Sequence, residues 1–383
     1  MSRDVSNRKL RAGIVGGGQG SFIGAVHRVA VALDGEAELV AGAMSSDPAR
    51  AEASAKAWYL PRSYGSFAEM AKAEASRPDG IDFVMITTPN HMHFPVAKAF
   101  LEQGIHVVSD KPMTFSLEEA QELVTLVERS KLVYALTHNY TGYPAVRQAR
   151  QMVRNGELGE IRKVLAEYIQ DWLMEPQEKT GNKQASWRTD PQRSGIAGCV
   201  GDIGTHAENL LEFITGLKIT SLSADLSTFV EGRALDDDAN MLLRLENGGK
   251  GLLTCSQIAA GEENALSLRV YGSKAGLEWH QQEPNTLIFK QPGHPVQLLR
   301  TNQGYMSDES KALSRTPPGH PEGFFEAFAN IYRLAFADIR RVESGQQAQG
   351  GYPTVYDGLR GMLFITRAVE SSRQGGAWID MKL

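Results

Sequence analysis

The segment Gly13-Ile14-Val15-Gly16-Gly17-Gly18-Gln19-Gly20-Ser21-Phe22-Ile23-Gly24 decides how the first third of the chain folds. Its glycine-rich part, residues 16–24, follows an apolar run, residues 10–15, and opens a helical pattern. Glycines at a strand-to-helix turn let the backbone approach a pyrophosphate, which the amide groups at the helix N-terminus bind. The strict Gly-x-Gly-x-x-Gly pattern fits in no register, so this loop is longer than usual, and a glycine turn without a ligand is the competing interpretation. Its position directly after a strand favours a dinucleotide-binding loop.

The residues around this loop alternate short apolar runs with helical patterns, which is typical of βαβ units. Five strands are predicted, at residues 10–15, 37–43, 81–86, 105–108 and 132–135. Strands that are joined through helices pair in parallel. We therefore expect residues 1–138 to form a doubly wound parallel sheet, a Rossmann domain that binds NAD or NADP.

The pattern changes after residue 138, where longer helices and alternating strands take over. Helices are predicted at 143–155 and 201–215, and a strand at 161–169. Alternating runs between 219 and 299, among them 241–245, 251–256 and 265–271, predict a large, mainly antiparallel sheet. Helices at 322–342 and 354–372 close the chain. The predicted fold class is α/β: the Rossmann domain is followed by an α+β domain, residues 139–383, for substrate binding and oligomerisation, with the final helices able to pack back on the first domain.

Composition excludes several classes of protein. The chain has 383 residues and a net charge of −5, from 40 Lys and Arg against 45 Asp and Glu, so nucleic acid is not expected as a partner. Cys199 and Cys255 lack the spacing of a zinc site, and no other metal site is expected. Without a signal peptide or an apolar stretch long enough to span a membrane, the expected location is cytoplasmic.

The choice of cofactor depends on the end of the second strand, Ala43-Met44-Ser45-Ser46-Asp47-Pro48. NAD-binding sheets usually place an acid there for the ribose hydroxyls, but here the acid comes later and can equally cap the next helix. Ser45 and Ser46 suit either a ribose hydroxyl or a 2′-phosphate. NAD and NADP both stay open, with a lean to NAD.

Three motifs in the chain carry reactive side chains. Thr87-Thr88-Pro89-Asn90-His91-Met92-His93 and Ser109-Asp110-Lys111-Pro112 each follow a predicted strand, at the sheet edge where such folds bind ligands. In the second domain, Gly198, Asp202 and His206 are spaced Gly-x-x-x-Asp-x-x-x-His. Together these motifs resemble the glucose-fructose oxidoreductase, inositol dehydrogenase and rhizopine-catabolism (Gfo/Idh/MocA) family, with Asp-Lys-Pro where that family has Glu-Lys-Pro.

This resemblance implies roles for named residues. Lys111, Asp202 and His206 correspond to the catalytic group of the family. The expected cofactor-binding residues are Gly16, Gly18, Gln19, Gly20, Phe22, Ile23, Ser45, Ser46, Thr88, Pro89, Asn90, His93, Asp110 and Lys111. For His93, capping or packing of the helix N-terminus is an equal alternative.

The catalytic residues suit the removal of a hydride from a secondary alcohol. Asp202 and His206 are spaced i, i+4, so they are expected on one face of a helix whose opposite stripe is buried. A histidine can take the hydroxyl proton, and a lysine ammonium stabilises the developing alkoxide. A surface ion pair is the competing interpretation for these residues.

Further residues are candidates for the substrate pocket: Asn139, Tyr140, Trp187, Arg188 and His320. The polar stretch 175–195 is predicted to be a loop over the site. Asp236-Asp237-Asp238 is predicted to be a solvated turn or strand edge, and His27 to be packed rather than catalytic.

The sequence thus predicts an NAD(P)-dependent dehydrogenase acting on a CH–OH group of a cyclic polyol, sugar or glycoside, as a homodimer or homotetramer. Two alternatives stay open. One is a glycoside-cleaving enzyme that oxidises its substrate transiently, and the other is a sugar-sensing regulator on the same fold, against which Lys111 and His206 count.

Overall fold

The computed structural model describes Val5 and residues 8–383, which divide into two compact units. Unit 1 comprises the described residues up to 138 together with residues 328–359, and unit 2 comprises residues 139–327 and 360–383. Within the described residues, no helix combines the length and apolar character needed to cross a membrane.

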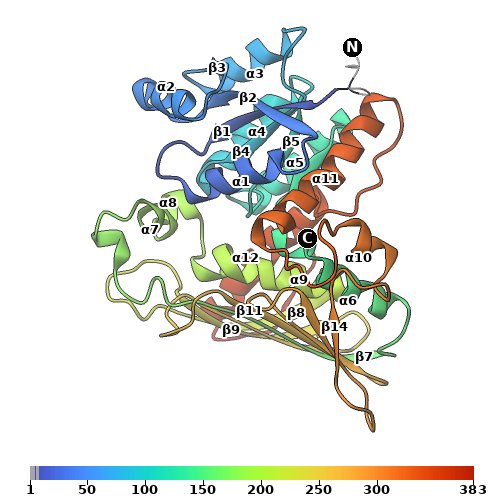
Figure 1. Ribbon diagram of the computed structural model, residues 1–383. Coiled ribbons are helices and arrows are strands. Elements are labelled where there is room, and N and C mark those ends of the chain that lie inside the picture. The colour runs from blue at the N-terminus through green and yellow to red at the C-terminus, as the bar shows by residue number, and fades with distance from the viewer. Residues whose placement is uncertain (1–4, 6–7) are drawn as a thin grey trace. The chain divides into compact units, whose positions relative to one another are not determined.

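Unit 1 is built on a parallel sheet of six strands in the order β3-β2-β1-β4-β5-β6 (Figure 1). The strands are β1 (Leu10–Gly16), β2 (Ala37–Ala43), β3 (Arg62–Ser63), β4 (Phe83–Thr87), β5 (His106–Ser109) and β6 (Tyr134–Leu136). The five strands predicted from the sequence are present, and the sixth, β3, has only two residues and no apolar run to mark it. The chain order reverses between β1 and β4, and such a switch point is where doubly wound sheets bind ligands.

Helices connect these strands. They are α1 (Phe22–Ala32), α2 (Pro48–Ala57), α3 (Phe67–Ala75), α4 (His93–Leu101) and α5 (Leu117–Ser130), and unit 1 also includes parts of α11 (Phe324–Glu343) and α12 (Val355–Arg373). Every residue of β4 is buried, as expected for a central strand covered on both faces. His27 on α1 is packed, as predicted: its Nδ1 lies 2.5 Å from the Tyr332 hydroxyl, and burial lowers its pKa to about 4.

Unit 2 is built on a sheet of nine strands in the order β14-β13-β12-β11-β7-β10-β9-β8-β15. The strands are β7 (Ile161–Ile169), β8 (Ile219–Ser227), β9 (Asp238–Leu245), β10 (Lys250–Ser256), β11 (Ala265–Gly272), β12 (Gly276–His280), β13 (Thr286–Lys290), β14 (Gln297–Arg300) and β15 (Ile379–Asp380). All neighbours pair antiparallel except β7 and β10, which are parallel. Because of this pair, residues that follow β7, follow β10 and precede β11 gather at one edge of the sheet.

Helices α6 (Pro144–Arg154) and α9 (Thr205–Thr215) lie over one face of this sheet (Figure 1). A 3-10 turn, η2 (Asn139–Gly142), begins the unit, and a short helix, α10 (Asp308–Ala312), packs on α6. The stretch 175–195 differs from the loop predicted, because it contains η3 (Gln177–Lys179), α7 (Lys183–Arg188) and α8 (Pro191–Ser194). The side chains of Asn182 and Asp190 cap α7 and α8, which explains why a polar segment folds into short helices.

Candidate active site

The glycine loop of unit 1 turns sharply at the end of β1. Gly16 has φ +82°, and a Cβ there would lie 2.8 Å from the Thr87 carbonyl oxygen. A Cβ on Gly24 of α1 would lie 2.4 Å from the Gly17 Cα, so the loop passes directly against the helix. Side chains at these two positions would push strand, loop and helix apart, which is the reason this turn needs glycine.

The N-terminus of α1 faces this loop. Ser21 caps the helix, its hydroxyl oxygen accepting the Gly24 N–H at 3.2 Å. Gln19 and Gly20 are exposed, Gly18 is half-buried, and the helix begins with Phe22, which is exposed, and Ile23, which is half-buried. An exposed glycine turn before a helix N-terminus is a cradle that fits the pyrophosphate of a dinucleotide.

The end of β2 offers hydroxyls and no free acid. The Ser45 hydroxyl accepts the Asp47 N–H at 3.1 Å, and Ser46 is exposed. The Asp47 carboxylate accepts the Ala49 and Arg50 N–H groups at 2.9 and 3.1 Å. Asp47 therefore caps α2, which is the alternative the sequence had left open for it.

The segment after β4 presents buried polar atoms at the sheet edge. Among the described residues, Thr88 Oγ1 and His91 Nδ1 are buried and have no hydrogen-bond partner. Pro89 precedes the 3-10 turn η1 (Asn90–Met92), and Asn90 is buried. Buried polar atoms that the protein leaves unpaired are expected where a polar ligand completes the hydrogen bonds, so this segment fits a bound cofactor.

His93 joins the two ligand-side segments of unit 1. Its Nε2 lies 2.8 Å from the Thr88 carbonyl oxygen and its Nδ1 lies 2.7 Å from the Pro112 carbonyl oxygen. Both ring nitrogens face backbone carbonyl oxygens, as the packing alternative predicts, and a role of His93 at the cofactor stays a prediction.

Asp110 and Lys111 follow β5. One carboxylate oxygen of Asp110 accepts the Lys111 N–H at 2.9 Å and the Thr137 hydroxyl at 3.1 Å, which fixes the turn. Lys111 itself is half-buried. Burial, and secondarily the positive charge of Lys111, lower the pKa of His138 to about 3.

In unit 2, Asp202 and His206 lie on different kinds of helix. Asp202 belongs to a π-turn, η4 (Val200–Gly204), and His206 to the first turn of α9. The expectation of one regular helix over 201–215 is wrong here, and the wider turn changes the direction in which Asp202 projects. Burial extends beyond the predicted stripe, since α9 is buried on nearly every side, Glu208 and Glu212 included.

A closed ring of hydrogen bonds lies beside His206. The Tyr168 hydroxyl donates to Asn264 Oδ1 at 2.7 Å, and Asn264 Nδ2 donates to the Tyr140 hydroxyl at 3.3 Å. The two hydroxyl oxygens lie 2.6 Å apart, and because the Tyr168 hydrogen is already used, Tyr140 donates to Tyr168. The Tyr140 ring packs edge-on against the His206 ring at 4.8 Å between centroids. Burial raises the pKa of both phenols, so Tyr140 and Tyr168 are uncharged.

Further hydrogen bonds connect this closed ring of hydrogen bonds to amide and indole groups along the same sheet edge. Gln170 Nε2 donates to Asn264 Oδ1 at 2.6 Å, and Trp172 Nε1 donates to Gln170 Oε1 at 3.1 Å. Gln170, Trp172 and Asn264 are half-buried, so their outer edges stay accessible. We call Tyr140, Tyr168, Asn264, Gln170 and Trp172 the polar row.

Asp202 is held from two sides. Gln257 Nε2 donates to Asp202 Oδ2 at 2.9 Å, and Arg188 Nε lies 3.3 Å from the same oxygen. The Arg188 guanidinium carbon lies 4.3 Å from the Trp187 ring centroid and 5.9 Å from that of Trp172. The structure thus brings the predicted residues Trp187 and Arg188 to Asp202.

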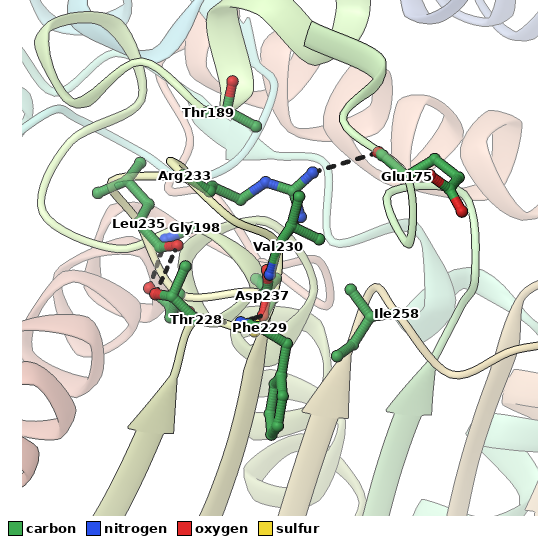
Figure 2. A network of polar contacts seen from close by, with 12 residues as sticks. Glu175, Thr189, Gly198, Thr228, Phe229, Val230, Arg233, Leu235, Asp237 and Ile258 are labelled. Atoms are coloured by element: carbon green, nitrogen blue, oxygen red, sulfur yellow. Dashed lines mark hydrogen bonds and ion pairs between the residues drawn. The ribbon is translucent and has the colours of Figure 1, made fainter.

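The loop between β8 and β9 contacts the backbone at the start of the π-turn and at Glu175 (Figure 2). Its Asp236 carboxylate accepts the Gly198 and Val200 N–H groups at 2.6 and 2.9 Å, at the start of the π-turn. Its Arg233 lies between Asp237, at 3.0 Å, and Glu178 of η3, at 3.1 Å, and donates to the Glu175 carbonyl at 3.4 Å.

The prediction of a solvated turn at 236–238 is therefore wrong for its first two residues. Asp236 and Asp237 are buried, because backbone N–H groups and Arg233 compensate the cost of desolvating their carboxylates. We call residues 228–237 the brace.

Two further predicted substrate residues are His320, which lies apart from this cluster, and Asn139, which lies next to Tyr140. His320 is exposed, and its Nδ1 lies 3.3 Å from the Pro317 carbonyl oxygen, so the structure does not bring it to the other candidates. Asn139 is buried next to Tyr140 in η2, and among the described residues its Nδ2 has no partner.

Sequence reasoning missed five residues of this cluster: Tyr168, Gln170, Trp172, Gln257 and Asn264. Tyr168 is the penultimate residue of β7, Gln170 and Trp172 follow that strand, Gln257 follows β10, and Asn264 precedes β11. Their common signal is the shared sheet edge, and it becomes visible only once β7 and β10 are known to pair in parallel.

Comparisons with known proteins agree with this architecture. Residues 10–138 match the oxidoreductase family with an NAD-binding Rossmann fold, and residues 146–278 match the GFO/IDH/MocA C-terminal domain. The chain is 33% identical to the uncharacterized oxidoreductase YfiI of Bacillus subtilis, over 99% of this chain and 98% of that protein.

Solved structures give the same result. An inositol dehydrogenase homolog from Azotobacter vinelandii, crystallised with NAD+, is 38% identical and covers 99% of each chain with a TM-score of 0.94. The structure of such a homolog from the same organism with NADH and myo-inositol is 36% identical over 99% of each chain, with a TM-score of 0.91.

Proposed function

Because the chain belongs to the Gfo/Idh/MocA family of NAD-binding oxidoreductases, we propose that it is a dehydrogenase for a secondary hydroxyl of a cyclic polyol, sugar or glycoside. The observation that carries this proposal is the polar row beside His206 in unit 2. Hydroxyl groups both donate and accept, and the half-buried amides of Gln170 and Asn264 each carry a second N–H and oxygen lone pairs that can do the same, while the phenol hydrogens are used within the row.

The row also favours an uncharged substrate. Its members are phenols, amides and an indole, and the nearby Arg188 guanidinium is already paired with the Asp202 carboxylate. A phosphate or carboxylate is bound best by cations free to form charge-assisted hydrogen bonds. We therefore propose a neutral polyhydroxylated ring, and the myo-inositol bound to the similar protein from Azotobacter vinelandii is a compound of that class.

We assign the proton chemistry to three side chains. His206 takes the proton of the reacting hydroxyl, and Asp202 orients the imidazole. The Lys111 ammonium stabilises negative charge that develops on the substrate oxygen. The bound nicotinamide cofactor supplies the redox chemistry by accepting a hydride from the carbon.

The cofactor site is assigned to unit 1. The loop from Gly16 to Gly20 and the start of α1 would hold the pyrophosphate, and Thr88 to Asn90 the ribose next to the nicotinamide. Ser45 and Ser46 would meet the adenosine ribose. We propose NAD as the preferred cofactor, in line with the ligands of the similar structures.

The test is a screen of inositols, sugars, anhydrosugars and glycosides, with a sugar phosphate and a uronate as charged competitors, followed by the near-ultraviolet absorbance of NADH. Lys111→Ala and His206→Ala should each lower turnover of the best substrate by about 100-fold while NAD binding is retained. The matched controls are Lys98→Ala, at a half-buried position of unit 1, and His294→Ala, at an exposed position of unit 2.

Near-normal turnover in both active-site variants would refute the assignment. Cleavage of a glycoside without net NADH would favour the transient-oxidation alternative. Sugar binding without any turnover would favour the regulator.

A further inference from the structure

Asp202 sits where the helix backbone alone does not fix its carboxylate. It lies in the π-turn η4, whose wider spacing separates it from the regular ladder of α9. Single π-turns inside helices recur at functional sites. The direction of this carboxylate therefore depends on the side chains that contact it.

Gln257 provides the directional contact. Its Nε2 donates to Asp202 Oδ2 at 2.9 Å, and since an ionised carboxylate only accepts, the amide must present its nitrogen. Arg188 lies 3.3 Å from the same oxygen, yet its Nε lacks hydrogen-bond geometry, and its Nη1 donates to Gln184 at 2.7 Å. Arg188 thus supplies charge, while Gln257 supplies the hydrogen bond.

Gln257 is itself rigidly placed. It is 2% exposed and follows β10 directly. Its N–H donates to the Asp237 carbonyl of the brace at 2.8 Å, and its carbonyl accepts the Leu173 N–H at 3.0 Å. With its backbone bonded on both sides, the amide reaches Asp202 from a fixed position.

We propose that Gln257 is a positioning residue for the reaction: its side-chain amide holds the Asp202 carboxylate in the orientation in which that carboxylate supports His206. This inference rests on the proposed function for its catalytic consequence. The contact itself is independent of the reaction catalysed.

The first variant removes the donor and keeps the shape. Gln257→Met should lower kcat by about 10- to 100-fold, the effect expected for one charge-assisted hydrogen bond. The affinity for NAD should stay unchanged, because the proposed cofactor residues all belong to unit 1. A control is Gln281→Met, which changes a half-buried glutamine of unit 2 that lies outside the cluster.

The second variant gives a signature that a merely structural role would not produce. Gln257→Glu places a carboxyl against Asp202, and one carboxyl of such a pair keeps its proton well above the usual range. When protonated, the new carboxyl donates to Asp202 as the amide did. The kcat of this variant relative to wild type should therefore rise by at least about 10-fold from pH ~8.5 to ~6.

The groups that bear on this pair are Arg188 of α7, which contacts the same oxygen, His206 of α9, and the Tyr140 and Tyr168 phenols, whose pKa the Asp202 charge raises in addition to burial. Arg188 attracts both carboxylates and reduces the repulsion, so the recovery should be larger when Arg188→Met is added.

A readout independent of turnover keeps the inference testable in every case. The thermal unfolding midpoint of Gln257→Glu should rise relative to wild type as pH falls over the same range, and adding Asp202→Asn should reduce that rise to the part that burial of the new carboxyl causes by itself. A rise that is equally large in the double variant would refute the contact. If wild type oxidises no polyol, the proposed function fails, and this thermal coupling still decides the contact. If wild type is active and the Gln257→Glu profile parallels that of wild type, the positioning role is refuted.

Discussion

Removal of Arg233 from the brace is expected to destabilise unit 2 strongly. The Arg233 and Asp237 side chains are each 1% exposed, and Glu178 is 15% exposed. Breaking a buried pair by removing one partner costs about 3–5 kcal/mol, because the remaining charge is left uncompensated. Asp237 keeps the Phe229 and Val230 N–H groups, and Glu178 can turn toward water. We therefore expect Arg233→Met to cost about 3 kcal/mol, at the lower end of that range.

Urea unfolding followed by tryptophan fluorescence measures this loss. Four of the five tryptophans, at positions 172, 187, 279 and 378, lie in unit 2, so the signal reports mainly on that unit. The midpoint should fall by about 1 M, given slopes of a few kcal/mol per molar urea. The control is Lys311→Met, which breaks an exposed pair with Asp308 on α10 and should not shift the midpoint measurably.

A compensating variant sharpens the test. Adding Glu178→Gln to Arg233→Met removes one of the two orphaned charges, so part of the lost stability should return. If Arg233→Met behaves like the exposed control, or if Glu178→Gln makes it worse, the account of the brace as a buried ionic support is incorrect.

The remaining predictions concern pH, the substrate pocket and the cofactor. The unfolded state protonates His27 more readily than the folded state, so the free energy of unfolding should lose about 3 kcal/mol as pH drops from above 6.5 toward 4. His27→Leu should reduce this pH dependence in urea titrations, and an unchanged dependence would contradict the burial argument. Arg188→Ala should raise KM for the best substrate by about 10- to 100-fold and leave NAD affinity alone, whereas Arg193→Ala on α8 should do neither; equal loss of both affinities would exclude Arg188 from the pocket. Because Asp47 is engaged as a helix cap, the kcat/KM values with NAD and NADP should differ by less than about 10³-fold, and a larger ratio would mean that another group reads the ribose.

Local patterns predicted most of unit 1. The apolar runs and the glycine loop located five of its six strands within a few residues, because periodicity and turn chemistry are local properties of the chain. Only β3 was missed, and a pair of residues such as Arg62 and Ser63 carries no periodic signal.

The site in unit 2 was less predictable for a physical reason. Sequence motifs marked Asp202 and His206, but the polar row depends on a parallel pairing of β7 and β10 between strands far apart in the chain. The burial of Asp236 and Asp237 could not be predicted for the same reason. Adjacent acids suggest a solvated turn, and only tertiary contacts with Gly198, Val200 and Arg233 make their burial favourable.

The most direct test of the proposed function follows the hydrogen that leaves the substrate. The best neutral polyol from the screen is prepared with deuterium on the carbon of its reacting hydroxyl, incubated with the protein and NAD, and the NADH is analysed by mass spectrometry. We predict that deuterium appears on the nicotinamide ring, and that turnover slows by a primary isotope effect in wild type. NADH without deuterium, or label lost to solvent, would contradict direct transfer from a CH–OH group and with it the central claim.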